Sequence, residues 1–206
     1  MEIQYAFSLF HSSYLPNLDL SVSLKQWYQD LPNKLILHRG SPPGVLLLHM
    51  AYWWMTIIIY RPLFRETSKI PPHSTEVAPS ATDACKLATQ SIITLLRRWK
   101  ECYGLRFSPV TIVQIAFNAG VTGLLLASEA ESSTQNNGFN DALECVNFLK
   151  EIGISWASAN YNAEVLERLI EKRKKDMVSP FPCSDANPVV AERKSDVGEP
   201  VNSTVW

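Results

Sequence analysis

The chain has 206 residues, 46% of them hydrophobic, with six Trp, eight Phe and seven Tyr. This length suits one domain with a tail, and the composition is ample for a sizeable core. Nineteen basic residues against twenty acidic ones give a net charge of −1, so the clustered Lys and Arg of a nucleic-acid-binding surface are not indicated.

The cysteines and the N-terminus indicate whether the chain is a zinc-binding or a secreted protein. Four cysteines lie far apart without a C-x-x-C pair, at positions 85, 102, 145 and 183, so free thiols in a reducing compartment are the simple interpretation. The first ten residues, MEIQYAFSLF, lack the basic start and the small-residue cleavage site of a signal peptide. Neither a zinc site nor secretion is predicted.

The chain begins with two helical patterns of unequal strength. We interpret residues 1–15 as a helix or the remnant of one. Residues 19–31 repeat apolar side chains at three- and four-residue steps, which predicts a helix that ends at Pro32. The predicted inner face consists of Leu20, Leu24, Trp27, Tyr28 and Leu31.

Residues 41–65 are the most apolar stretch of the chain, with no charge between positions 45 and 60. Ser41 can cap this helix, and the two prolines after it fit a first turn whose N–H groups lack partners. Arg61 lies near the far end, where a cation suits the helix dipole. A helix that is apolar on every side is either the centre of a bundle or a membrane span.

Two further helices follow a proline-containing loop predicted over residues 66–79. Ser80 and Asp83 resemble a capping box, and the helix they open should end at Gly104, with Arg97 paired to Glu101 one turn away. Ser108 and Pro109 open the next helix, which is uncharged over residues 110–127. Small residues at steps of four, three and four predict a close helix contact along Ala116, Gly120, Gly123 and Ala127.

The C-terminal part predicts a loop, two helices and a tail. Residues 131–138 are the loop, Asn140 caps a helix that ends at Gly153, and Ser155 caps the last helix. The basic run at 172–175 is either a helix end that suits the dipole or a nuclear-import patch. Residues 177–206 lack periodicity and are expected to be a disordered tail. No stretch alternates with period two, so the prediction is an all-α, irregular bundle of about six to seven helices.

The two uncharged runs, 45–60 and 110–127, sit at or just under the ~18–20 residues that a membrane span needs. Trp53 and Trp54 lie inside the first run, although spans place Trp at the water interfaces. Gln114 and Asn118 lie inside the second, which is tolerable only against another helix. The remaining helices are amphipathic and need an apolar partner. We therefore favour a soluble bundle, and a two-span membrane protein is the alternative.

No catalytic arrangement stands out. The histidines form no H-x-x-x-H pair, no phosphate-binding glycine loop or G-x-S-x-G elbow occurs, and His49 is interpreted as a core histidine with a satisfied hydrogen bond. Asp141 and Glu144, like Glu129 and Glu131, are interpreted as solvated helix-end charges. We predict that the chain is not an enzyme and has no cofactor or metal site. The side chains predicted to be buried are Trp53, Ile57, Ile58, Leu95, Phe117 and Leu124.

Several stretches, in order, resemble the regulatory "middle homology" domain of the fungal zinc-cluster transcription factors. The run L-L-H…I-I-I-Y-R-P-L-F over residues 47–64 is similar to its L-H…I-L-H-R-P-F helix, with Tyr60 in place of the commoner His. Residues 84–99, G-L-R-F-S-P at 104–109 and W-A-S-A at 156–159 continue the resemblance, which is nearest to regulators of nitrogen assimilation and xylan use. The family-motif residues are His49, Arg61, Pro62, Arg106, Phe107, Pro109 and Trp156.

The resemblance implies an effector-responsive helical domain of a nuclear transcription factor. It covers roughly residues 19–176 and implies that 1–176 is the C-terminal half of a larger regulatory domain. The family's six-cysteine, two-zinc DNA-reading module is absent here, so no direct nucleic-acid contact is expected. The implied partners are the remainder of the factor, a co-regulator or small-molecule inducer, or a second copy; a membrane is not among them.

Overall fold

The structure, a computed structural model, describes residues 19–66, 77–129 and 132–178. Every regular element in these ranges is helical, which confirms the all-α prediction. The predictions for residues 1–15 and for the tail after 178 lie outside the described residues. The elements are a helix over residues 19–29, η1 (Asn33–Leu35), α2 (Pro43–Glu66), α3 (Val77–Tyr103), η3 (Leu105–Phe107), α4 (Thr111–Glu129), α5 (Ser132–Ile152) and α6 (Ala157–Val178).

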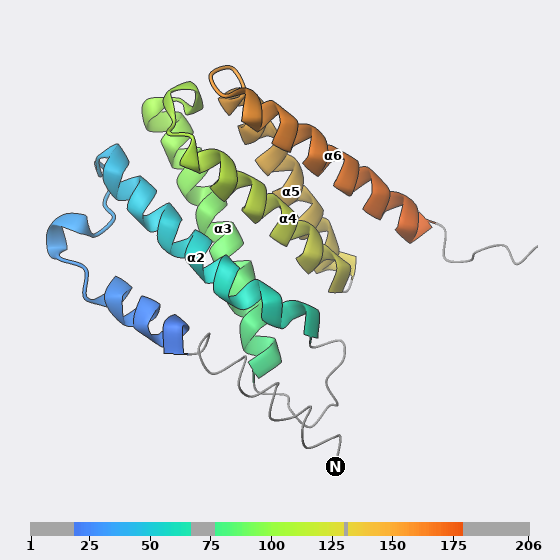
Figure 1. Ribbon diagram of the computed structural model, residues 1–206, viewed down its shortest axis with the longest axis horizontal. Helices are drawn as coiled ribbons and strands as arrows, with labels where there is room; N and C mark the ends of the chain where they lie inside the picture. Colours follow the sequence, from blue (N-terminus) through green and yellow to red (C-terminus); the bar gives the residue numbers. More distant parts are fainter. Residues whose placement is uncertain (1–18, 67–76, 130–131, 179–206) are drawn as a thin grey trace, which may run out of the picture.

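The five long helices form two layers. Consecutive helices run in opposite directions, with α2, α4 and α6 side by side in one layer and α3 and α5 in the other (Figure 1). The helix over residues 19–29 lies along the outer side of α2, and α6 closes the opposite edge of the bundle. Each layer leaves an outer face open to solvent, where side chains of neighbouring helices can line a groove.

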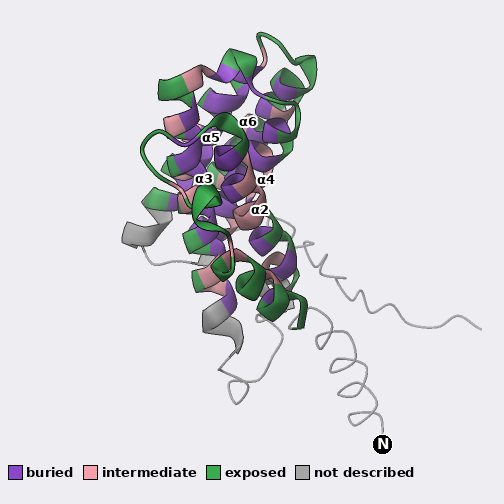
Figure 2. Cartoon of the chain, turned by 90° about the vertical axis from the view of Figure 1, so that its left-hand side faces the viewer, coloured by how far each residue is buried: buried purple, intermediate pink, exposed green. Residues whose placement is uncertain are grey.

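One continuous core joins α2 to α6. Buried residues gather between the layers and exposed ones lie on the outer faces (Figure 2). α4 is the central helix because it packs against α2, α3, α5 and α6. The largest fully buried side chains are Leu46, Met50, Ile57, Ile92, Ile93, Leu96, Leu105, Ile112, Ile115, Leu149, Ile152 and Leu166.

The closest helix contact is between α4 and α5, along the predicted stripe of small residues. A Cβ atom built on Gly138 of α5 would lie 2.5 Å from the carbonyl oxygen of Gly123 and 2.8 Å from the Cβ of Ala127, both on α4. A Cβ on Gly120 would come within 2.4 Å of Leu166 on α6. At Gly138 the obstructing atoms include α4 backbone, so only glycine fits there and the two helices touch through their backbones. At Gly120 the nearest atom is the end of the Leu166 side chain, which can shift.

Helix ends follow the sequence signals at some positions and depart from them at others. Gly104 ends α3 with a positive φ of 74°, as a glycine stop predicts. Ser41 is buried but is not the cap of α2, because the helix begins at Pro43 and Pro42 directly precedes it. The Ser41 hydroxyl accepts a hydrogen bond from the His38 N–H at 2.8 Å. Ser155 likewise donates its hydroxyl to the Arg106 carbonyl at 2.7 Å instead of capping α6.

Two helices begin earlier than predicted. α3 starts at Val77, so Ser80 and Asp83 lie inside the helix and not at its start. α5 starts at Ser132, so the predicted loop at 131–138 is helical from that residue on and Asn140 is an interior position. The tertiary contact of Gly138 with α4 explains the second case, since packing overrides the weak helix propensity of a polar, glycine-containing run.

Burial follows most of the predicted core with clear exceptions. Ile57, Leu95 and Leu124 are buried, and Trp53 and Phe117 are partly buried against the core. The prediction that Ile58 is buried is wrong, because its side chain is 44% exposed on the outer side of α2. The face predicted for the first helix is also partly wrong, because Leu20 and Trp27 are exposed, whereas Ser21 is buried and Leu24 and Tyr28 are partly buried.

Two helical stretches, Pro43–Pro62 and Thr111–Ser128, are long and apolar enough to cross a membrane. In this fold 61% of the α4 stretch and 39% of the α2 stretch is buried. The central helix of a soluble bundle passes the same test of length and composition, and α4 occupies that place. The packing therefore does not favour the two-span alternative.

Candidate functional site: a polar pocket between two helices

His49 is a satisfied core histidine, as its place on an apolar helix predicts. It is 4% exposed, its Nδ1 lies 2.6 Å from the Tyr28 hydroxyl, and its Nε2 lies 2.9 Å from the Leu35 carbonyl oxygen. The carbonyl can only accept, so Nε2 carries the proton and Nδ1 accepts from the Tyr28 O–H. His49 thereby joins α2 to the helix over residues 19–29 and to η1.

The ring of Tyr28 reinforces this junction. It stacks on Tyr52 with a centroid distance of 3.6 Å and meets His49 edge-on at 5.2 Å. Burial, and secondarily the neighbouring Tyr52, raises the pKa of Tyr28, so its hydroxyl stays protonated and able to donate. The aromatic residues at this end of α2 hold the first helix in place.

Arg61 and Pro62 stand near the other end of α2. Arg61 donates through Nη1 to Oδ1 of Asn118 at 3.4 Å, and the Asn118 amide donates to the Gln114 carbonyl within α4. Asn118 in an apolar run is thus placed against another helix, as predicted. Pro62 lies inside α2 and is exposed. This part of the motif links α2 to α4.

The remaining motif residues meet at one corner of the bundle. The Trp156 indole N–H donates to the Ser108 carbonyl at 2.9 Å, beside the hydrogen bond from Ser155 to the Arg106 carbonyl. Arg106 and Pro109 are exposed, and Phe107 is 79% exposed. The structure therefore divides the motif residues between two positions on α2 and this corner, and it does not bring them into one site.

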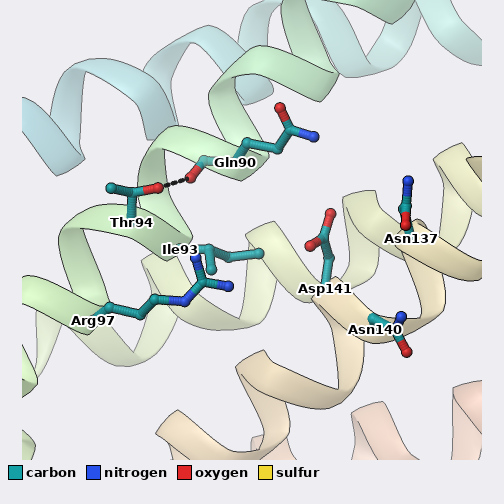
Figure 3. A pocket seen from close by; sticks show the side chains of 7 residues that line it. All are labelled: Gln90, Ile93, Thr94, Arg97, Asn137, Asn140 and Asp141. Atoms are coloured by element: carbon teal, nitrogen blue, oxygen red, sulfur yellow. Dashed lines mark hydrogen bonds between the residues drawn. The ribbon is translucent and has the colours of Figure 1, made fainter.

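A polar pocket lies between α3 and α5, away from every motif residue. Its volume is about 390 Å³, and α3 and α5 each line one wall with polar side chains (Figure 3). In Figure 3 the Asp141 carboxylate points into the space between Gln90 and Asn137. The lining residues are Gln90, Ile93, Thr94, Arg97, Asn137, Asn140 and Asp141.

The charged groups at this pocket are an Arg–Glu ion pair and a separate aspartate. Arg97 donates from Nε and Nη2 to the two carboxylate oxygens of Glu144, each at 2.5 Å, and this pairing raises the pKa of Arg97. Asp141 is half-buried, and burial, followed by repulsion from Glu144, raises its pKa. These contacts correct two predictions, because Arg97 pairs with Glu144 rather than Glu101, and Asp141 and Glu144 are mid-helix groups at a helix contact.

Sequence reasoning missed this pocket, although a signal was present. Gln90, Thr94 and Arg97 recur at steps of four and three. On the facing helix, residues 137 and 140 and residues 141 and 144 are three apart, and residues 137 and 141 are four apart. Such spacing places each set on one helix face. The signal was hidden because residues 131–138 were predicted to be a loop.

A second groove, of about 650 Å³, lies between the helix over residues 19–29, α2 and α3. Its walls combine the aromatic residues of α2 with apolar and charged side chains, and Lys25 and Asp83 supply opposite charges across it. Its lining residues are Ser21, Leu24, Lys25, Tyr52, Trp53, Thr56, Tyr60, Asp83, Ala84 and Leu87.

Metal ligands and reactive thiols are not gathered in the part of the chain that the structure describes. No group of three or more His, Cys, Asp or Glu side chains there could hold a metal ion. Cys85 and Cys145 are buried, and burial raises the pKa of the Cys145 thiol. Cys102 is exposed.

Two curated fungal proteins are similar to this chain. The nitrogen assimilation transcription factor nirA of Emericella nidulans is 30% identical over 149 residues, which are 72% of this chain and 16% of that protein. The nitrogen assimilation transcription factor nit-4 of Neurospora crassa is 26% identical over 154 residues, 75% of this chain and 13% of that protein. No family model matches the chain. No solved structure matches it either. The similarity thus covers most of this chain and a small part of each relative.

Proposed function

We propose that this chain is a regulatory helical domain of a fungal transcription factor, which controls transcription without reading DNA itself. The observation that carries the proposal is the similarity to nirA over 72% of the chain, supported by the similarity to nit-4. The resemblance of the 47–64, 104–109 and 156–159 stretches to the middle homology domain points to the same part of such a protein. The 16% of nirA covered leaves room for a zinc-dependent DNA-reading module elsewhere in the longer protein.

The fold supports an effector-responsive role. The pocket between α3 and α5 is lined by side chains from both helices, and the Arg97–Glu144 ion pair spans them. A ligand that binds one spacing of these helices better than another shifts the equilibrium between the two packings. Because α4 contacts α3 and α5, such a shift passes into the core of the bundle.

The implied location and partners belong to the same proposal. A transcription regulator works in the nucleus, and the basic run at 172–175 lies on α6 with three of its four side chains exposed, where an import receptor can reach it. The partners are the remainder of the longer protein, a co-regulator or inducer, and in one alternative a second copy. The chain itself needs no metal or cofactor for this role.

A reporter assay tests the proposal. The full chain is fused to a heterologous DNA-binding domain in a filamentous fungus and measured on a reporter under several nitrogen sources. We expect reporter transcription to differ from that of the DNA-binding domain alone, and to return to that level in Leu96→Asp, which places a charge at a fully buried position. An unchanged reporter under every nitrogen source, from a fusion that accumulates normally, would overturn the proposal.

The absence of DNA reading is tested separately. The purified chain without the fusion is titrated against random and promoter-derived duplexes. The near-neutral balance of charge predicts weak binding that is insensitive to sequence. Tight, sequence-specific binding would place the DNA-reading surface within this chain and contradict that part of the proposal.

A further inference from the structure

We propose that the pocket between α3 and α5 binds an ammonium or guanidinium group, with the Asp141 carboxylate as its anionic partner. This inference rests on the proposed function, because it names the chemistry of the effector that the regulatory domain would sense. It depends on the pocket's charges, on its neutral side chains and on its size.

The charges of the pocket leave one carboxylate unused. Arg97 and Glu144 neutralise each other through two hydrogen bonds. Asp141 forms no hydrogen bond or ion pair with any residue in the described ranges. The pocket therefore carries a net charge of about −1 at neutral pH, which favours a cation and opposes a carboxylate or phosphate ligand.

Arg97 is unsuited to serve as an anion receptor here. Its Nε and Nη2, the edge that holds a carboxylate through two parallel hydrogen bonds, are both engaged by Glu144. An incoming anion would be left with the Nη1 side of the guanidinium, close to the carboxylates of Glu144 and Asp141 that repel it. A cation is attracted by those carboxylates.

The neutral side chains complement a ligand with several N–H donors. Gln90, Asn137 and Asn140 each provide an amide oxygen that can accept. The Thr94 hydroxyl donates to the Gln90 carbonyl at 2.8 Å, so its oxygen faces the pocket only as an acceptor. Ammonium and guanidinium groups carry three to five donors and no acceptor, which matches this set.

Partial burial makes the Asp141 carboxylate responsive to a cation. Removal from water raises its pKa and leaves its charge poorly solvated in the unliganded pocket. A bound cation restores the lost solvation by a charge-assisted hydrogen bond. The volume of about 390 Å³ is at the small end of the range for ligand pockets and suits a metabolite of a few carbon atoms or one side chain.

The experiment uses calorimetric titration and thermal melting of the full chain with defined probes. The cationic probes are putrescine and methylguanidine, and the matched controls are 1,4-butanediol and succinate. We expect saturable binding and a raised melting temperature with a cationic probe, and neither effect with the controls. Equal binding of butanediol or succinate, or no binding by any cation tested, would overturn the inference.

Variants of the pocket decide whether Asp141 is the partner. Asp141→Asn should weaken binding about tenfold or more, because it removes a charge-assisted hydrogen bond. Glu101→Gln, which removes an exposed carboxylate from the same helix as Gln90 and Arg97, is the matched control and should bind as the parent does. Gln90→Glu should tighten binding and Gln90→Lys should abolish it, so the inference stays testable if Asp141→Asn fails to fold. Unchanged affinity in the folded pocket variants would refute it.

One further arm distinguishes the source of the cation. A soluble peptide with one Lys or Arg, in place of the free probes, binds if the pocket takes a partner's side chain, whereas binding of the free probes alone identifies a small molecule. A failure of the cation-binding inference can be distinguished from a failure of the proposed function. Binding without any reporter effect in the fusion assay would leave the cation site standing and remove the regulatory role, and a reporter effect without binding would do the reverse.

Discussion

Asp141 is expected to lower the stability of the fold at neutral pH, because its carboxylate is half-buried. Its pKa in the folded state lies above the unfolded value of 3.8, raised first by burial and then by Glu144, with Arg97 acting in the opposite direction. The folded state thus holds the proton more tightly, and stability should rise as pH falls from above the folded pKa to 3.8. We predict that Asp141→Asn melts higher than the parent at pH 7 and that the difference disappears below pH 3.8.

Thermal melts of both proteins from pH 7 to pH 3.5, in one buffer series at constant ionic strength, measure this difference. A lower melting temperature of Asp141→Asn at pH 7 would mean that Arg97 and other groups stabilise the carboxylate, contrary to the packing. The same variant is the one expected to lose cation binding, so a gain in stability would also exclude unfolding as the cause of that loss.

The Tyr28–His49 hydrogen bond gives a second prediction about single side chains. Tyr28→Phe keeps the stacked ring on Tyr52 but leaves the buried Nδ1 of His49 without its donor. We expect the free energy of unfolding to fall by about 1–3 kcal/mol, the cost of leaving a buried acceptor unsatisfied. Urea unfolding followed by far-ultraviolet circular dichroism measures the change.

Tyr161→Phe is the control for that prediction. Tyr161 is exposed on α6 and its hydroxyl forms no hydrogen bond within the described ranges, so its loss should leave unfolding unchanged. If the two variants unfold alike, the hydrogen bond to His49 contributes nothing to the attachment of the first helix.

At the scale of helices, the contact of α4 with α5 is the most demanding feature of the fold. Gly138→Ala would place a methyl group 2.5 Å from the Gly123 carbonyl oxygen, which backbone atoms cannot avoid by a change of rotamer. We expect the substitution to destabilise the protein by about 1–3 kcal/mol through forced separation of the helices. Urea unfolding measures it.

Gly44→Ala provides the matched glycine substitution. Gly44 lies in the first turn of α2, and a Cβ built there meets nothing within 4 Å. Alanine should be neutral or stabilise by up to about 1 kcal/mol, because it favours the helix. If Gly138→Ala also proved harmless, the close approach of α4 and α5 would not be a constraint on the sequence.

The long helices show which features could be predicted from the sequence and which could not. The long uncharged runs of α2 and α4, the small-residue stripe and the Gly104 stop are local signals, and they predicted these elements and their class correctly. The early start of α5 depends on Gly138 meeting Gly123, which are distant in sequence, so no local signal could place it. The prediction of a loop at 131–138 also concealed the pocket between α3 and α5, because Asn137, which lines it, was assigned to that loop.

The burial errors have the same origin. The uncharged run places Ile58 and Ile57 on an apolar helix without saying which side faces the bundle, and only the positions of α3 and α4 decide that Ile57 is buried and Ile58 exposed. Ser155 is a suitable cap by type, but its hydroxyl donates to the Arg106 carbonyl of a distant segment. The Ser41 hydroxyl instead accepts from the His38 N–H three residues earlier. Tertiary partners therefore decide the cases of Ile58 and Ser155, whereas a local turn decides that of Ser41.

For the whole molecule, the main question raised by the composition is whether lipid or protein surrounds the two apolar helices. α4 contacts four other helices, and its polar groups find protein partners, with the Thr122 hydroxyl donating to the Asn118 carbonyl at 2.7 Å. α2 has a more open outer side that includes Met55 and Ile58.

Carbonate extraction distinguishes the two environments at this scale. The tagged chain is expressed in a fungal cell, and the membrane fraction is washed at alkaline pH. We expect the chain in the supernatant, because the buried fraction of α4 and the ion pairs joining α3, α5 and α6 belong to a bundle that excludes lipid from its centre. Loose association through the open side of α2 would be released by the wash, whereas retention with the membrane pellet would require α2 and α4 to leave their partners and span the bilayer.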